Sequence, residues 1–204
     1  FEDVCFNYGE NKPILFETNF VVRRGAKLTL MGQNGAGKST LFSMIMGELQ
    51  IEEGRIILGQ GLKVAIAKQF IPHTKWSLAV RDFLQEGFKE KVYDIDKRAV
   101  SVFEQVALNV PLDRPIKDLS GGQKGRLLIA QALIQEPDIL LLDEPTNNLD
   151  KAGIQLLTDF MKEYTKTVIV ISHDADFLNA FTHGVLYVNT QTYQVEQYVG
   201  NYFK

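Results

Sequence analysis

This sequence of 204 residues has one cysteine, no long apolar run and no excess of positive charge. Its single cysteine, Cys5, cannot form an internal disulfide, which excludes a small disulfide-held secreted scaffold and favours a reducing, cytoplasmic location. The longest apolar runs, 139–142 and 168–171, are far shorter than the roughly 20 residues of a membrane-spanning helix, so we do not expect the chain to cross a membrane. A net charge of −3 gives no sign of the basic surface that binds nucleic acid nonspecifically, but it does not exclude a local basic patch.

The sequence also has no internal repeat, no low-complexity segment and no linker rich in proline and serine. We therefore expect residues 1–204 to form a single domain with subdomains. Apolar residues make up 45% of the chain, which is ample for a buried core. The sequence starts at Phe1, with neither a methionine nor a signal-like stretch, so we expect it to be a piece of a longer protein.

Short apolar runs with strand character alternate with helical patterns along most of the chain. In the clearest helix, apolar positions 95, 99, 102, 103 and 106 fall on one face. Strand patterns occupy 1–30, two short runs within 55–67 (Ile56 to Ile57 and Val64 to Ile66), 139–142, 168–171 and, as a short hairpin, 185–199. Helical patterns occupy 41–47, 72–118, 127–134 and 154–161. Buried short strands separated by helices predict an α/β fold with a parallel sheet covered on both faces.

A glycine-rich turn between a predicted strand and a predicted helix fits the P-loop pattern, Gly32-Gln33-Asn34-Gly35-Ala36-Gly37-Lys38-Ser39. Glycines let backbone amides turn inward around phosphate oxygens, and the helix N-terminus adds its positive end. We expect Lys38 to reach the β- and γ-phosphates and Ser39 to offer its hydroxyl to Mg²⁺. The alternative, a glycine turn that merely precedes a helix, does not explain why spacing and context agree. The residues expected to line this nucleotide site are Gly32, Asn34, Gly35, Ala36, Gly37, Lys38, Ser39 and Thr40.

The buried strand 139–142 runs into two adjacent carboxylates, Asp143 and Glu144. Because side chains alternate along a strand, the two carboxylates point to opposite sides. In P-loop proteins an Asp at this place holds the Mg²⁺ shell, and a neighbouring Glu orients or deprotonates the attacking water. The alternative is that Glu144 only caps the end of the strand by hydrogen bonding.

The run Leu119-Ser120-Gly121-Gly122-Gln123 opens the helix that leads to this strand and gives a second helix terminus able to receive an anion. Together, the P-loop, this run and the Leu-Leu-Leu-Asp-Glu strand resemble the ATP-binding cassette (ABC) superfamily, whose signature is LSGGQ. The resemblance covers essentially the whole chain. A Ser-Gly-Gly turn that only caps a helix is the alternative for this run.

The resemblance implies the fold as well as the activity. We expect a P-loop NTPase (RecA-like) core with a mostly parallel sheet, an N-terminal antiparallel β subdomain and an inserted α-helical subdomain. The helical subdomain is expected over 72–120, with the signature at its end. The implied cofactors are ATP and Mg²⁺, and the implied partner is a second cassette.

Further family positions can be matched one at a time. Tyr8 looks like the aromatic that stacks on adenine, with a strand-surface tyrosine as the alternative. Gln69 looks like the glutamine that senses Mg²⁺ and the γ-phosphate, with a solvated loop glutamine as the alternative. Asp150, in Asn148-Leu149-Asp150, is similar to the D-loop that crosses to the partner, and His173 looks like the switch histidine that contacts the γ-phosphate. Ordinary structural roles are expected for His73 and His183, packing for Trp76, and surface positions for the pairs 23–24 and 97–98.

Three details resemble the ABC-F branch, whose tandem-cassette members act on the ribosome: the runs 144–150, 172–178 and 198–202. The run 144–150 departs from this branch at Asn148, where histidine is usual, and the run 172–178 departs at Ala175, where arginine is usual. Positions 69 to 119 leave room for two or three helices but not for a long inserted arm of the kind that contacts the ribosome. The resemblance therefore implies the ribosome or its rRNA as a partner, with an arm that is short, absent or removed.

The implied active unit is two cassettes packed head to tail around two ATP molecules. One cassette supplies Lys38, Ser39, Gln69, Asp143, Glu144 and His173. The other supplies Ser120, Gly121, Gly122, Gln123 and Asp150. Hydrolysis to ADP and phosphate removes the γ-phosphate contacts that hold the two halves together.

Three classes of function stay open. The first is an ATPase of the ABC-F kind that acts on ribosomes. The second is the motor subunit of a membrane transporter, which needs a groove in the helical subdomain for a coupling helix. The third is a nucleotide-gated interaction module without hydrolysis, against which the presence of Glu144 and His173 argues.

Overall fold

The computed structural model describes residues 1–9 and 12–200. The C-terminal run 198–202 therefore lies partly outside the described residues. The strands are β1 (Glu2–Asn7), β2 (Pro13–Thr18), β3 (Lys27–Gly32), β4 (Glu53–Arg55), β5 (Val64–Ala67), β6 (Ile139–Asp143), β7 (Thr167–Ile171), β8 (Gly184–Asn189) and β9 (Gln194–Val199). The helices are α1 (Lys38–Ile45), α2 (Val80–Gln85), α3 (Ile95–Gln105), α4 (Gly121–Leu133), α5 (Lys151–Glu163) and α6 (Ala175–Phe181), with 3₁₀ turns η1 (His73–Lys75) and η2 (Ile116–Asp118).

The centre of the fold is a six-stranded sheet in the order β5-β6-β7-β3-β8-β9. The pairs from β5 to β8 are parallel, and β9 pairs with β8 antiparallel as the second strand of a hairpin. Every residue of β7 is buried, as expected for a strand that is covered on both faces. The predicted α/β fold with a mostly parallel sheet is confirmed, and so is the hairpin near the C-terminus.

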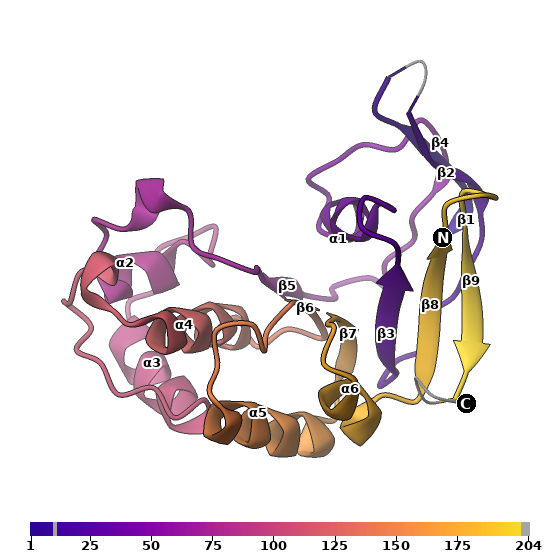
Figure 1. Ribbon diagram of the computed structural model, residues 1–204. Helices are drawn as coiled ribbons and strands as arrows, with labels where there is room; N and C mark the ends of the chain where they lie inside the picture. The colour runs from indigo at the N-terminus through magenta and orange to yellow at the C-terminus, as the bar shows by residue number, and fades with distance from the viewer. Residues whose placement is uncertain (10–11, 201–204) are drawn as a thin grey trace.

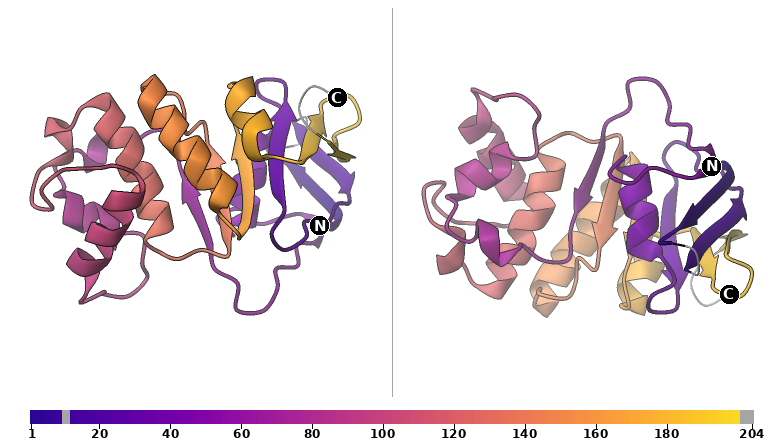
Figure 2. Two further views of the ribbon diagram at one scale, coloured as in Figure 1. Left: turned by 90° about the horizontal axis from the view of Figure 1, so that it is seen from below. Right: turned by 90° about the horizontal axis from the view of Figure 1, so that it is seen from above.

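Two apolar layers lie on opposite faces of this sheet, and alternate residues of its strands divide between them. Leu140, Leu142, Val168 and Val170 belong to the layer under the helices α2 to α6. Their neighbours 141, 169 and 171 belong to the layer that contains α1. Figure 2 shows α5 and α6 over one face and α1 over the other. The two-residue period of the strands thus places helices on both sides of the sheet.

A second, antiparallel sheet in the order β2-β1-β4 lies near the N-terminus, as the resemblance implies. The prediction of a strand at Ile56 and Ile57 is wrong, because β4 ends at Arg55. Arg55 pairs with Glu2, where β1 begins, so the ladder has no further partner residue. Ile57 is 62% exposed, so its apolar side chain does not indicate a buried position on a strand.

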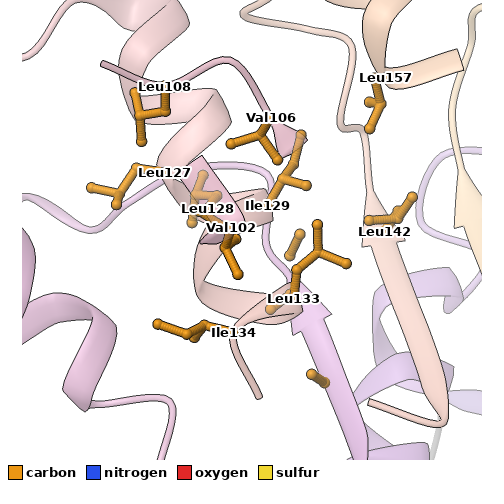
Figure 3. Packing of buried hydrophobic residues seen from close by; sticks show 14 of the residues in the cluster. Val102, Val106, Leu108, Leu127, Leu128, Ile129, Leu133, Ile134, Leu142 and Leu157 are labelled. Carbon is orange, nitrogen blue, oxygen red and sulfur yellow. The ribbon is translucent and has the colours of Figure 1, made fainter. Parts of the chain in front are cut away.

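The segment between β5 and β6 is helical and gathers at one end of the molecule, with α2, α3 and α4 side by side (Figure 1). The apolar face predicted for the helix at 95–106 is buried throughout. Figure 3 shows part of this packing, with Val102 and Val106 next to α4 and Leu142 on the side of the strands. Within the described ranges, no helix combines the length and the apolar composition that crossing a bilayer requires.

Candidate functional site

The glycine-rich turn follows β3 and leads directly into α1. Gly35 and Gly37 have φ values of 81° and 99°, in the left-handed region that favours glycine. A Cβ atom built on Gly37 would lie 2.3 Å from Cγ2 of Ile14 on β2. Position 37 therefore accepts no side chain unless the side chain of Ile14 moves, so a residue of the antiparallel sheet packs directly against the start of α1.

Lys38 is the first residue of α1, and its side chain bends back over the turn. Its Nζ donates hydrogen bonds to the carbonyl oxygens of Gly32, at 2.8 Å, and Gln33, at 3.0 Å. An ammonium group has three donors, so these contacts leave one for a ligand. The ammonium is thus held beside the backbone amides of the turn, where a phosphate binds in P-loop proteins.

A cleft of about 540 Å³ opens in front of this turn. It is lined by Tyr8, Ile14, Asn34, Gly35, Gly37, Lys38, Ser39, Thr40, Gln69, Asp143, Glu144, Asn147, Ile171 and His173. Two of the predicted residues, Gly32 and Ala36, do not line the cleft: the Gly32 carbonyl binds Lys38, and Ala36 is buried. Three of the lining residues, Ile14, Asn147 and Ile171, are not among those predicted from the sequence. Of these, only Asn147 had a signal, since it lies in the run 144–150.

Glu144 and His173 face each other across the ends of β6 and β7. Glu144 Oε1 lies 3.2 Å from Nε2 of His173, and Oε2 accepts a hydrogen bond of 3.3 Å from the His173 backbone N–H. The Glu144 side chain is buried, whereas the His173 side chain is 73% exposed. Glu144 has φ = 51°, an uncommon value for a residue with a side chain, and its N–H donates to the Ile171 carbonyl at 2.8 Å. The hydrogen bonding proposed as the alternative role of Glu144 is therefore present, and its carboxylate also borders the cleft.

Asp143 is half-buried at the end of β6, and burial raises the pKa of its carboxyl group. The charge of Glu144 raises this pKa further, and the charge of Lys38 opposes both effects. A cation bound beside Asp143 would stabilise the charged form. Ser39, Gln69 and Asp143, the three expected metal ligands, border both this cleft and a neighbouring cavity of about 340 Å³.

These ligands fit Mg²⁺, which prefers oxygen ligands and completes its shell with water and phosphate. In the described ranges there is no group of three or more His, Cys, Asp and Glu side chains that could hold a metal. A site of one carboxylate, one hydroxyl and one amide oxygen is thus suited to a metal that arrives with a nucleotide.

Tyr8 and Gln69 lie at the rim of the cleft. The Tyr8 hydroxyl is 3.2 Å from Oγ1 of Thr40, and its ring packs edge-on against Phe6 with centroids 5.0 Å apart. Tyr8 is 53% exposed, so part of its ring is open to a ligand. Gln69 is exposed two residues beyond the end of β5.

None of the signature residues borders this cleft. The Ser120 hydroxyl accepts from the Gln123 N–H at 3.2 Å, and the Gln123 Oε1 accepts from the Ser120 N–H at 2.9 Å. These two bonds form a capping box at the start of α4, so the cap considered as an alternative exists. Gly121 is exposed, and a Cβ built on it meets no atom within 4 Å. Figure 1 shows α4 and α1 in different parts of the molecule.

The D-loop packs against the signature helix of its own chain. A Cβ on Gly122 would lie 3.3 Å from the Asn148 carbonyl oxygen, and Asp150 Oδ1 lies 3.4 Å from Nη2 of Arg126. Asp150 also caps α5 by accepting a 2.9 Å hydrogen bond from the N–H of Gly153, yet its side chain stays 71% exposed. The signature helix and the D-loop are therefore in contact with each other, and no residue of 119–123 or 148–150 lines the P-loop cleft.

Gly37→Ala is expected to destabilise the chain more than Gly35→Ala, although both glycines have left-handed backbone, which costs a side chain about 1–3 kcal/mol. The difference arises because only the methyl group at position 37 collides with Ile14. Urea unfolding without nucleotide measures it, and adding Ile14→Ala should recover part of the loss in Gly37→Ala. Equal losses in both single variants, with no recovery, would show that Ile14 does not constrain the turn.

Comparison with known proteins places this geometry in a family. The model of the family described as "ABC transporter" matches residues 15–147. The ATP-binding protein Uup of Escherichia coli strain K12 is 35% identical in an alignment 204 residues long, which covers 98% of this chain and 32% of Uup. A dimeric ATP-binding cassette solved in a post-hydrolysis state with ADP and phosphate is 25% identical, with a TM-score of 0.76 and 97% of each chain covered. A Clostridium perfringens protein, cbiO1, from an ABC transporter complex is 28% identical, with a TM-score of 0.72, and the match covers 98% of this chain and 86% of cbiO1.

The chain spans less than half of the length of the curated relatives that it matches first. The family model, in contrast, covers well over half of the chain, from β2 through the P-loop to the carboxylates at the end of β6. The chain therefore belongs to the ABC transporter family and has the fold of an ATP-binding cassette.

Proposed function

We propose that this chain is an ATPase cassette of the ABC-F kind, which binds ATP with Mg²⁺ in the P-loop cleft and hydrolyses it in a sandwich with a second cassette. One observation carries the proposal. A single cleft gathers the P-loop, Gln69, both carboxylates and His173, while the signature is exposed on a different surface. A nucleotide bound in this cleft lacks the contacts that a signature supplies until another cassette provides them.

Binding of the phosphates rests on the turn and on Lys38. Two carbonyl groups hold the Lys38 ammonium in place by hydrogen bonds. The ammonium and the backbone amides at the start of α1 together make this side of the cleft positive. Mg²⁺ at Ser39, Gln69 and Asp143 would neutralise the charge of the β- and γ-phosphates. Tyr8, which borders the same cleft, is 53% exposed and offers part of its ring for an adenine to stack on.

Glu144 is the residue best placed to act on the attacking water. Its carboxylate borders the cleft, and the hydrogen bond from the His173 N–H together with its contact to the His173 ring fixes its orientation. A fixed carboxylate can accept the proton of a water molecule as that water attacks the γ-phosphate. His173 is exposed beside it, so its ring is free to contact the γ-phosphate.

The signature acts on the ATP of the other cassette in this proposal. The exposed start of α4 carries the positive end of a helix, and Gly121 allows close approach of a phosphate. The similar cassette that was solved as a dimer with ADP and phosphate supports such an arrangement. Asp150, exposed next to the signature, would reach across the same interface.

The Uup proteins are ATP-binding proteins of the ABC-F family, and the sequence identity to Escherichia coli Uup (35%) is higher than that to cbiO1 of an ABC transporter complex (28%). This difference supports the ABC-F branch over a transporter motor. The ribosome as partner rests on the family resemblance of the runs 144–150, 172–178 and 198–202. In a transporter motor, a membrane-spanning subunit would take the place of the ribosome.

Glu144→Gln should lower ATP turnover by about 10²- to 10⁴-fold, because an amide cannot accept the proton of the attacking water. ATP-dependent association of two cassettes should persist, because the phosphate contacts remain. Phosphate release and size-exclusion chromatography measure the two effects, with Glu163→Gln on the exposed end of α5 as the matched control. Turnover at the wild-type rate in Glu144→Gln would rule out the role given to Glu144.

Mixing two inactive variants tests whether the site is shared between cassettes. Lys38→Ala removes the phosphate contact, and Gly121→Glu places a carboxylate where the partner's phosphate approaches while suiting the N-terminus of α4. Each variant alone should be inactive. A mixed pair contains one complete site, so mixing should restore part of the ATPase activity. No recovery on mixing, although both variants fold and associate, would contradict a shared site.

The ribosome is tested by co-sedimentation of the full-length protein that contains this chain, in its Glu144→Gln form. ATP should increase the fraction that sediments with ribosomes, and ADP should not, because only the closed sandwich keeps both γ-phosphate contacts. The same protein with Gly121→Glu added is the control that cannot close. Sedimentation that is absent, or equal with and without ATP, would remove the ribosome from the proposal and leave the ATPase intact.

A further inference from the structure

The indole of Trp76 lies between the loop of Gln69 and the start of α4. Its Nε1 donates a 3.1 Å hydrogen bond to the carbonyl oxygen of Ile71, two residues beyond Gln69. The ammonium of Lys124 lies 3.8 Å from the centroid of the same ring. Lys124 is one turn into α4, and its N–H donates to the Ser120 carbonyl at 2.9 Å. One half-buried side chain thus touches both segments.

Backbone hydrogen bonds join the same two segments. Residues 76–81, which follow the loop of Gln69, run antiparallel to 112–117, which lead into α4. The four bonds are Lys117 N–H to Trp76 O (2.9 Å), Ile116 N–H to Leu78 O (3.0 Å), Val80 N–H to Arg114 O (3.0 Å) and Arg81 N–H to Leu112 O (2.8 Å). A shift of one segment is therefore transmitted to the other.

The contact with Lys124 is electrostatic in origin. The first turn of α4 has no acidic residue, so the lysine lies near the positive end of the helix without a compensating charge. In the part of the chain that the structure describes, this ammonium makes no ion pair or hydrogen bond, and it lies over the negative face of the indole. His73 packs on the ring as well, with centroids 4.0 Å apart. Trp76 thus supplies the interaction that places a cation beside the signature.

We propose that Trp76 is a positioning residue, which couples the loop of Gln69 in this chain's own cleft to the Ser120 end of α4 through the ammonium of Lys124. The role in catalysis rests on the proposed function, since it requires that the signature close a second cassette's site. Nucleotide bound beside Gln69 then changes the placement of the signature that this chain presents. The coupling itself lies within one chain and can be measured without a partner.

Trp76 is the only tryptophan of the 204-residue chain, so its fluorescence reports this contact directly. In the Glu144→Gln chain, Mg-ATP should change the emission of Trp76, because movement at Gln69 alters the distance between the indole and Lys124. The change should persist when Gly121→Glu is added, because that variant blocks the sandwich but leaves the chain's own cleft intact. It should disappear in Gln69→Ala even though ATP binds. Saturating ATP without an emission change, or a change that Gly121→Glu abolishes, would overturn the proposal.

Lys124 variants measure the effect on catalysis. Lys124→Met keeps the length of the stem but removes the cation, and it should lower kcat by about two- to fivefold, the range expected for one cation–π contact at a partly exposed site. The KM for ATP should stay unchanged, because the chain's own cleft keeps its contacts. Lys124→Arg should restore kcat, and Trp76→Phe combined with Lys124→Met should be no worse than the poorer single variant. Lys97→Met, an exposed lysine of α3, is the matched control.

The outcomes separate this inference from the function on which it rests. If the wild-type chain binds Mg-ATP but neither pairs with a second cassette nor hydrolyses the ATP, the proposed function fails, and the emission of Trp76 still decides the coupling. If the wild-type chain is active and Lys124→Met behaves like Lys97→Met, the coupling is wrong and the ATPase stands. A KM that rises with the fall in kcat, or no rescue by Lys124→Arg, would assign Lys124 a different role and overturn the proposal as well.

Discussion

The parallel pairing of buried strands is the constraint on which the rest of the structure depends. Asp143 pairs with Ile171, Ala67 with Leu142 and Thr29 with Val170, so β3, β5, β6 and β7 all end at one edge of the sheet. At that edge, β3 leads into the P-loop, β5 into the loop of Gln69, β6 into Glu144 and β7 into the segment with His173. Residues more than 100 positions apart in sequence come together because the strands that carry them are held in register by apolar packing on both faces.

The P-loop and the carboxylates at the end of β6 could be predicted from the sequence because each corresponds to a short, continuous sequence pattern. The spacing from Gly32 to Ser39 describes one turn, and the run into Asp143 and Glu144 describes the end of one strand. Parallel strands then bring such ends together by a general rule. The structure shows that Lys38, Asp143, Glu144 and His173 share one cleft, while the roles given to them stay predictions.

Other features could not be predicted because they depend on contacts between distant segments. The sequence does not show that Ile14 fills the space beside Gly37, since β2 reaches the P-loop only in the folded chain. The end of β4 at Arg55 is set by where β1 begins, and not by the apolar residues that follow. Trp76 was expected to pack, and it does, but nothing in its sequence neighbourhood indicated that Lys124 would lie over its ring.

The start of α4 meets two demands that oppose each other. Glycine at positions 121, 122 and 125 weakens a 13-residue helix, by about 1 kcal/mol relative to alanine at the interior position 125. The capping box of Ser120 and Gln123 offsets part of this loss. Two of these glycines lie where a Cβ would be within 3.4 Å of Asn148. The helix therefore gives up intrinsic stability where the D-loop approaches it closely.

The left-handed backbone at Glu144 has a consequence for how such a chain evolves. A residue with a Cβ in this conformation raises the free energy of the folded state, whereas glycine would not. Random change that is filtered only for a well-folded product would thus drift toward glycine at this position and lose the carboxylate. Where glutamate persists in descendants of this sequence, its carboxylate must be under selection, either for its contacts with His173 or for the chemistry of the site.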